Sequence, residues 1–270
     1  MGAFRDLLMR GGRRPRWIDH TDYCGRLLAA GDIPFGDVAR FIDWHRKAQG
    51  LLRPDVAALP LVPLLDFWLA GHGDLVSAMA GRKRLLYPLK VLLADEDLRG
   101  HIRALLEGLR LTYGGQPLAF VIPSPRAFIL YAAAKAGLPD DDEVTLDDVD
   151  SAAMYMADFL RAFGDTGIDV LLMEEVPGIA AGDDDLAACQ AVLNIAGHYR
   201  WDVGLRLDDG AELSAVDFVI APAGKAAGIQ LPQAYWRGEG AAAEGGQFIY
   251  ARIPPDAEPE AVLGRLAALP

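Results

Sequence analysis

Residues 96–137 read EDLRGHIRALLEGLRLTYGGQPLAFVIPSPRAFILYAAAKAG and contain a helix, a strand and a second helix in close succession. The first part, 96–113, has leucine and isoleucine at helical spacing, at positions 98, 102, 105, 106 and 109. Two glycines end that helix, and the apolar run 118–122 follows as a short buried strand. Ser124 and Pro125 then supply the N-cap and the first-turn proline of a helix that extends to about residue 137.

The same alternation continues along the chain. The sequence predicts helices over 147–164, 184–197 and 258–269, and strands over 168–173, 202–207, 216–220 and 248–253. Short apolar strands separated by helices or loops indicate a parallel sheet that is covered on both faces. We therefore predict an α/β fold, a (β/α)8 TIM barrel with room for shortened or irregular units. A doubly wound open sheet is the alternative, although no glycine-rich phosphate loop follows any expected strand.

The charge of the chain is uneven. The 270 residues are 52% hydrophobic with a net charge of −12, which suits one large domain and argues against general nucleic-acid binding. Residues 1–53 nevertheless carry a net charge of +4, from 10 Lys/Arg and 6 Asp/Glu. We predict that 1–53 form a basic, helical N-terminal extension and that 54–270 form the barrel, in one compact domain. The basic segment either favours an anionic small ligand or is simply solvated.

Compartment and membrane association are also predicted from the sequence. The chain has only 2 cysteines, which favours a reducing compartment and allows no disulfide framework. The first 16 residues contain five arginines and no apolar run of the kind a secretory signal needs. The most apolar stretch, 56–70, is interrupted by Pro60 and Pro63 and is too short to cross a bilayer. We expect a cytoplasmic protein that does not enter membranes.

Three stretches resemble the uroporphyrinogen decarboxylase-like superfamily. They are HIRALLEGLRLTYGGQPLAFVIPSPRAFILYAAAKAG (101–137), ADFLRAFGDTGIDVLLMEEVPG (157–178) and QFIYARIPPDAEPEAVLGRL (247–266). A weaker match, WIDHTDYCGRLL (17–28), is similar to the family's arginine-rich amino-terminal motif. The resemblance implies a (β/α) barrel, shared with cobalamin-independent methionine synthases and corrinoid methyltransferases.

The resemblance also implies site residues at the carboxyl ends of the strands, where barrel enzymes do their chemistry. Tyr131, six residues after Pro125, matches an active-site tyrosine, although a tyrosine packed on a helix face is an equal alternative. Glu174 matches an acidic position, and Glu175 stands where the family has serine. Because neighbouring side chains of a strand point to opposite faces, we expect one carboxylate in the pocket and the other elsewhere, with a structural ion pair for at least one. The second glutamate would repel the acids of a porphyrinogen.

Three further positions are inferred from the same resemblance. Arg26 falls on one of two arginines that bind substrate carboxylates, whereas Asp22 replaces the other. Asp66 is the candidate for the family's central aspartate, expected at a strand end after the apolar segment 59–65. The family's last-strand histidine is replaced by alanine, with Arg252 beside it as a group that could bind a carboxylate. The histidines at 45, 72 and 101 are interpreted as surface residues.

These residues predict a cofactor-free lyase of the decarboxylase type, acting on an anionic small molecule without a metal. Tyr131, Glu174, Glu175 and Asp66 would be its catalytic groups, and Arg26, Arg252 and Pro125 would line the substrate site. The departures from the family pattern argue against the standard reaction. A barrel that binds a metabolite or partner without chemistry is one alternative. A corrinoid-linked methyltransferase is another, although the zinc-binding thiolates of that branch are missing. A homodimer is left open.

Overall fold

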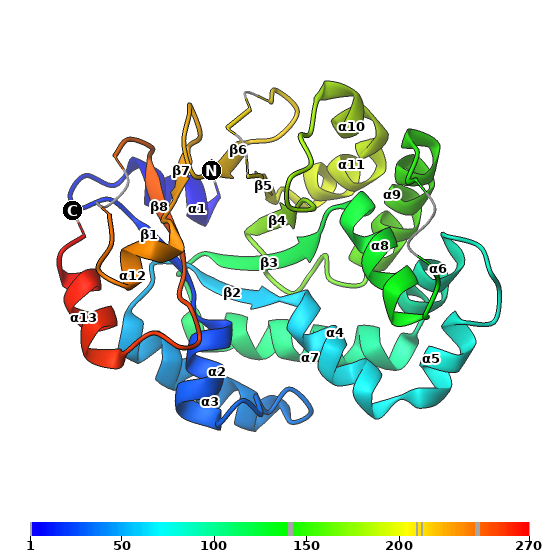
Figure 1. Ribbon diagram of the computed structural model, residues 1–270, viewed down its shortest axis with the longest axis horizontal. Helices are drawn as coiled ribbons and strands as arrows, with labels where there is room; N and C mark the ends of the chain where they lie inside the picture. Colours follow the sequence, from blue (N-terminus) through cyan, green and yellow to red (C-terminus); the bar gives the residue numbers. More distant parts are fainter. Residues whose placement is uncertain (1, 140–142, 209, 212, 241–243, 270) are drawn as a thin grey trace.

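The computed structural model describes residues 2–139, 143–208, 210–211, 213–240 and 244–269. Within them, eight parallel strands form a nearly closed barrel surrounded by helices, a (β/α)8 TIM barrel (Figure 1). The strands are β1 (Arg16–Asp19), β2 (Ala57–Pro60), β3 (Leu118–Pro123), β4 (Val170–Glu174), β5 (Asp202–Arg206), β6 (Phe218–Ala221), β7 (Gly228–Gln230) and β8 (Phe248–Arg252). The helices are α1 (Ala3–Met9), α2 (Thr21–Ala29), α3 (Val38–Leu52), α4 (Leu61–Gly71), α5 (Gly73–Met79), α6 (Tyr87–Leu93), α7 (Glu96–Tyr113), α8 (Pro125–Lys135), α9 (Leu146–Arg161), α10 (Asp183–Ala188), α11 (Gln190–Tyr199), α12 (Gln233–Trp236) and α13 (Pro259–Ala267).

The segment that predicted the fold forms the expected elements. Helix α7 spans the predicted range, and its five spaced apolar residues are all buried against the core. Strand β3 is buried along its whole length. The Ser124 hydroxyl caps α8 by accepting from the backbone N–H of Ala127 at 3.1 Å, and Pro125 occupies the first turn. The local helix and strand predictions for this segment are therefore confirmed.

The amino-terminal segment belongs to the barrel, which corrects the boundary expected at residue 54. Strand β1 pairs with β8 in register from Arg16 opposite Ile249 to Asp19 opposite Arg252. The segment thus contributes a strand as well as helices. The pattern did not predict β1 or the three-residue β7, because such short strands are stabilised by their neighbours in the sheet rather than by their own periodicity. The strand end expected after the apolar segment 59–65 is misplaced, because β2 ends at Pro60 and α4 begins at Leu61.

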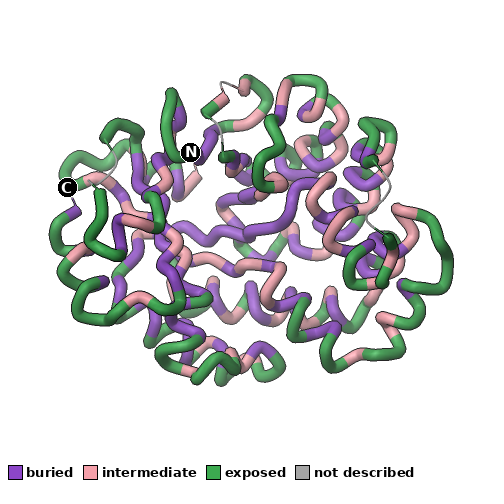
Figure 2. Tube along the Cα trace, viewed as in Figure 1, coloured by how far each residue is buried: buried purple, intermediate pink, exposed green. Residues whose placement is uncertain are grey.

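Helix α1 closes the amino-terminal end of the barrel. Its buried Phe4 and Leu7 join an inner cluster of side chains from the strands. The ring of Phe4 lies 5.9 Å from that of Trp17, 5.0 Å from that of Phe218 and 5.5 Å from that of Phe248, measured between ring centroids. The interior of the barrel is therefore filled with side chains. Figure 2 shows that the chain at the centre of the molecule is mostly buried.

Two glycines make room for these rings. A Cβ atom at Gly204 would lie 2.3 Å from the ring of Phe218, and one at Gly228 would lie 2.4 Å from the ring of Phe248. Both glycines are on inward-facing positions of strands next to the strand that carries the ring. The large aromatic residues of β6 and β8 thus require the smallest residue on the neighbouring strand.

Strands β1 and β2 flank the one open seam among the described strands. The strand order is β1-β8-β7-β6-β5-β4-β3-β2, so these two strands stand at its ends. A backbone hydrogen bond from Asp55 N to Arg16 O, 2.8 Å long, joins the chain just before β2 to the start of β1.

His45 of α3 lies in this seam, which corrects its interpretation as a surface residue. The side chain is buried, and its Nε2 lies 3.2 Å from the carbonyl oxygen of Ala58 in β2. Because a carbonyl only accepts, Nε2 carries the proton, and Nδ1 accepts from the hydroxyl of Tyr113 at 2.7 Å. A neutral imidazole therefore satisfies a carbonyl that β1 leaves unpaired. His72 and His101 are half-buried.

Acid should weaken the fold through His45. Burial, together with the nearby His20, lowers the pKa of His45 to about 3. Below about pH 6.5 the imidazole of the unfolded chain is protonated, whereas His45 of the native protein stays neutral. The free energy of unfolding therefore keeps its full contribution from neutral His45 above that pH and decreases as the pH falls, by about 1.4 kcal/mol per pH unit. Urea unfolding of the wild type and of His45→Gln at several pH values between about 6.5 and 4 measures this slope.

The variant should show a shallower pH dependence by about one proton, whatever its stability at neutral pH. His198→Gln is the matched control, because His198 is exposed on α11. Equal slopes for the wild type and His45→Gln would contradict the assignment of His45 as a buried neutral group.

Candidate functional site

The carboxyl ends of the strands carry a cluster of polar side chains that points into the barrel mouth. We call it the mouth cluster, and its members are Asp19, Glu174, Arg206, Gln230, Tyr250 and Arg252. All except Tyr250 are the last residue of a strand. They share a face with inward residues such as Trp17, because side chains two residues apart along a strand point the same way. The register of the parallel sheet therefore gathers them at one level.

Glu174 is the centre of the mouth cluster. Its Oε1 accepts from Arg206 Nε at 2.8 Å and from Arg252 Nη2 at 2.9 Å, and the Tyr250 hydroxyl lies 3.4 Å away. Arg252 also donates from Nε to Asp19 Oδ2 at 2.8 Å. Two guanidinium groups and two carboxylates thus form one connected network. The side chains of Arg206 and Glu174 are only 11% and 20% exposed, so this pair is largely shielded from bulk water, whereas Arg252 is 35% exposed.

Electrostatics favour the charged forms of Asp19 and Arg252. Burial is the largest single effect on Asp19 and Arg252 and disfavours their charged forms. Their mutual attraction and hydrogen bond, together with other neighbours such as Glu174, outweigh burial, so the pKa of Asp19 is lowered and that of Arg252 is raised. A backbone N–H of Thr21 also lowers the pKa of Asp19. Burial, followed by the charge of Glu174, raises the pKa of Tyr250. At neutral pH the tyrosine is therefore a neutral hydroxyl donor in the barrel mouth.

Glu175 lies on the other side of β4 from the mouth cluster. Its carboxylate accepts from the Ser124 hydroxyl at 2.9 Å and from the backbone N–H of Val176 at 2.8 Å. Burial raises the pKa of Glu175, while those two hydrogen bonds oppose the shift. The two adjacent glutamates therefore have different surroundings: Glu174 lies in the mouth, and Glu175 joins the end of β4 to the N-cap of α8.

Asp66 and Tyr131 lie together, but on outer helices. The Tyr131 hydroxyl of α8 donates to Asp66 Oδ1 of α4 at 2.8 Å, and Lys135 forms an ion pair with the same oxygen at 2.8 Å. Asp66 was expected at a strand end, and this placement is wrong because β2 ends at Pro60 and α4 begins at once. Burial, with the bond to Asp66, raises the pKa of Tyr131. The Tyr131 hydroxyl therefore links α8 to α4 and is not part of the mouth cluster.

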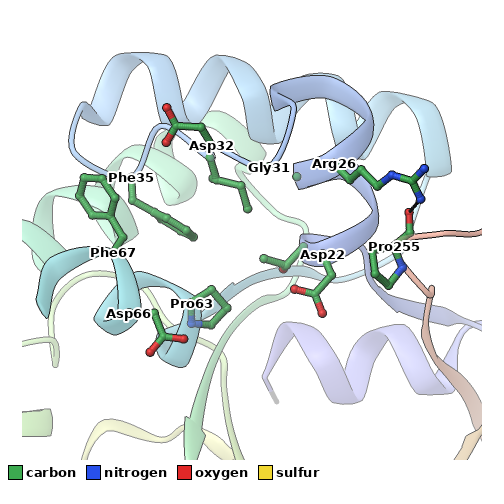
Figure 3. Close-up of a pocket in the computed structure, with 12 residues that line it drawn as sticks. Asp22, Arg26, Gly31, Asp32, Phe35, Pro63, Asp66, Phe67 and Pro255 are labelled. Carbon is green, nitrogen blue, oxygen red and sulfur yellow. Dashed lines mark hydrogen bonds between the residues drawn. The ribbon is translucent and has the colours of Figure 1, made fainter. Parts of the chain in front are cut away.

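A pocket of about 520 Å³ opens beside the barrel mouth, between α2, the following loop and α4 (Figure 3). Its lining combines apolar walls with charged groups: Asp22, Arg26, Asp32, Ile33, Phe35, Pro63, Asp66, Phe67 and Pro255 are among them. The Arg26 guanidinium donates to the carbonyl oxygen of Pro255 at 2.8 Å, and the close-up shows it directed toward that residue. Arg26 and Asp66 therefore line the same pocket. Its charged residues are one arginine and the three carboxylates of Asp22, Asp32 and Asp66.

Asp22 connects this pocket to the mouth cluster. Burial raises the pKa of Asp22, and the charge of Asp19 raises it further, while Arg252 opposes the shift. The pocket is continuous with the start of α2, where Thr21 N donates to Asp19 Oδ1 at 3.2 Å. Asp22 therefore carries a larger protonated fraction at neutral pH than an ordinary aspartate.

Pro125 contributes no functional group to this arrangement and is buried at the start of α8. Sequence reasoning missed four members of the mouth cluster, namely Asp19, Arg206, Gln230 and Tyr250. Arg206 offered a usable signal, because it is a charged residue near the end of the predicted strand 202–207. Asp19 and Gln230 follow strands that the pattern did not reveal.

The described residues offer little for metal or thiolate chemistry. They contain no group of three or more His, Cys, Asp or Glu side chains that could hold a metal ion. Cys24 and Cys189 are buried, and burial raises the pKa of each thiol to about 12. At neutral pH both remain protonated and are poor metal ligands or nucleophiles. No helix in this part of the chain combines the length and apolar character needed to cross a bilayer.

Comparisons with known proteins do not assign the site. No protein-family model matches the chain, and a search of curated proteins finds no relative. The chemistry of the barrel mouth therefore has to be argued from its own residues.

Proposed function

We propose that this protein is a divergent member of the uroporphyrinogen decarboxylase-like superfamily that binds a small carboxylate-bearing molecule at the barrel mouth and acts on it as a cofactor-free lyase. The proposal rests on one observation. Arg206 and Arg252 both donate to Glu174 at the carboxyl ends of their strands, where barrel enzymes bind substrates. The cytosol is the compartment we propose, in keeping with two free, buried cysteines.

The two arginines retain donors for a ligand. Arg252 uses Nε and Nη2 in the network, and Arg206 uses Nε and Nη1, the latter toward Gln230 at 3.3 Å. A guanidinium has five N–H donors in a fixed plane, so each side chain keeps unused N–H groups. Glu174 and Asp19 hold the planes in position. A carboxylate entering the mouth would thus meet two oriented guanidinium groups, which suits bidentate binding.

The lyase step that fits these residues is loss of CO2 from the bound carboxylate. The carbon–carboxyl bond breaks, its electron pair stays on the substrate carbon, and a proton then replaces CO2 on that carbon. Arg206 and Arg252 would orient the substrate through a second anionic group. Asp22, with its raised pKa, is the carboxyl next to the mouth that best suits proton donation.

Binding without turnover is the second candidate. It is favoured by the internal pairing of the mouth cluster, in which each of the four charged groups already contacts an opposite charge. A metabolite carrier needs only that binding surface, whereas a lyase also needs the proton donor. We do not propose the corrinoid-linked methyltransferase, because both thiols remain protonated.

The test is titration calorimetry of the wild type with a panel of mono-, di- and tricarboxylates, followed by a CO2-release assay on every binder. Arg206→Lys keeps the charge but loses the planar fork, so we expect its affinity for the carboxylate to fall roughly tenfold. Arg40→Lys on α3 is the matched control, since Arg40 is exposed and is not a member of the mouth cluster.

The outcomes separate the candidates. Binding that depends on Arg206, with CO2 release that Asp22→Asn abolishes, supports the lyase. Binding with the same dependence and no CO2 from any binder supports the carrier instead. Equal affinities for the wild type and Arg206→Lys would remove the mouth cluster from ligand binding altogether.

A further inference from the structure

A second concentration of charge lies far from the barrel mouth, on the α5–α6 connection. We call it the basic pocket; it has a volume of about 380 Å³ and is lined by Arg82, Arg84, Leu85, Leu86, Tyr87, Lys90, Asp148 and Tyr155. Figure 1 shows α5 and α6 at the end of the molecule opposite α13 and β1. The basic pocket is therefore a site of its own.

The cations of the basic pocket lack anionic partners. The segment RKRLLYPLK, residues 82–90, contains four basic residues and no acidic one, in a chain whose net charge is −12. Arg82, Arg84 and Lys90 form no ion pair and no side-chain hydrogen bond with any described residue. The mouth arginines, in contrast, are each paired with a carboxylate.

The single acidic residue of the lining offsets only one of these positive charges. Asp148 Oδ2 accepts from the Thr145 hydroxyl at 2.6 Å and from the Thr145 backbone N–H at 3.1 Å. These bonds form the capping box at the start of α9. The carboxylate is thereby held at the helix end, where it forms no ion pair with the cations, so three cations and one carboxylate line the cavity.

Aromatic rings hold two of the cations in place. The guanidinium carbon of Arg82 lies 5.1 Å from the centroid of the Tyr87 ring, and Lys90 Nζ lies 5.6 Å from that of Tyr155. A ring attracts the cation through its face and leaves the N–H groups free. The donors are thus oriented without being used, as an anion-binding site requires.

We propose that the basic pocket binds the polyphosphate group of a small molecule. Three unpaired cations around one cavity call for a ligand with several negative charges close together, and linked phosphoryl groups supply these with oxygens at the spacing that arginine and lysine bind. A single carboxylate would leave part of the excess positive charge unbalanced. The volume is within the range of small-molecule sites, roughly 300–1,000 Å³.

Titration calorimetry with inorganic triphosphate, pyrophosphate and phosphate tests this, first at low salt and then at about 0.15 M salt. We expect affinity to fall in that order. Arg82→Gln/Arg84→Gln should weaken triphosphate binding by at least roughly tenfold. The matched control is Arg46→Gln/Lys47→Gln on α3, which removes the same charge from two exposed cations that pair with Asp43. The control should stay within about twofold of the wild type.

Three results would overturn the proposal: no triphosphate binding at low salt, equal weakening in the control variant, or phosphate binding as tight as triphosphate. A nucleoside triphosphate then identifies the source of the polyphosphate. If the nucleoside triphosphate binds more tightly than inorganic triphosphate, and Tyr155→Leu abolishes that difference, the ligand is a nucleotide. If the two bind equally, the ligand is polyphosphate itself. All variants are at exposed or half-buried positions, and thermal unfolding verifies that each is folded.

Discussion

Phe4→Ala is expected to lower the free energy of unfolding by roughly 3–5 kcal/mol. Phe4 is 1% exposed, and its ring contacts those of Trp17, Phe218 and Phe248 at the floor of the barrel. Its removal would leave a cavity lined by three aromatic rings on different strands, which cannot move together without disturbing the sheet. Urea unfolding at neutral pH measures the loss.

The size of this effect distinguishes a barrel floor from a surface appendage. Met9→Ala is the control, because Met9 is on the same helix with 81% of its surface exposed. It should change stability by no more than about 0.5 kcal/mol. A loss below about 1 kcal/mol for Phe4→Ala would mean that α1 is only loosely attached to the barrel.

Glu174→Ala has the second largest expected effect, a loss of about 3 kcal/mol in the free energy of unfolding together with the loss of ligand binding. The substitution leaves Arg206 and Arg252 next to each other without the carboxylate that joins them. We use the lower end of the range for a broken buried ion pair, because Arg252 keeps Asp19 and its side chain is 35% exposed. Urea unfolding and carboxylate titration of the same sample give both values.

Two variants serve as controls for Glu174→Ala. Glu107→Ala breaks an exposed pair with Arg103, 3.0 Å long, on α7 and should change stability by about 0.5 kcal/mol. The double variant Glu174→Ala/Arg206→Ala removes one of the unpaired charges, so it should lose less than the sum of its single substitutions. Additive losses would show that the two side chains do not act as a pair.

The barrel could be predicted from the sequence because its elements are largely determined by residues close together in the chain. Helix α7 needs only apolar residues three or four positions apart, and the start of α8 needs only Ser124 and Pro125. Glu174 and Arg252 became candidates through the family resemblance and because each lies at the end of an expected strand. The contrasting surroundings of Glu174 and Glu175 follow from the alternation of side chains along a strand.

The sequence by itself therefore determined the barrel class, its longer elements and part of the barrel mouth. Only the tertiary structure decided that β1 belongs to the sheet, that Asp66 lies on a helix and that His45 fills a seam. The same holds for the meeting of Asp19 with Arg252, which are 233 positions apart in the chain. The physical reason is that strand pairing and barrel closure depend on contacts between distant residues, and these leave no local pattern in the sequence.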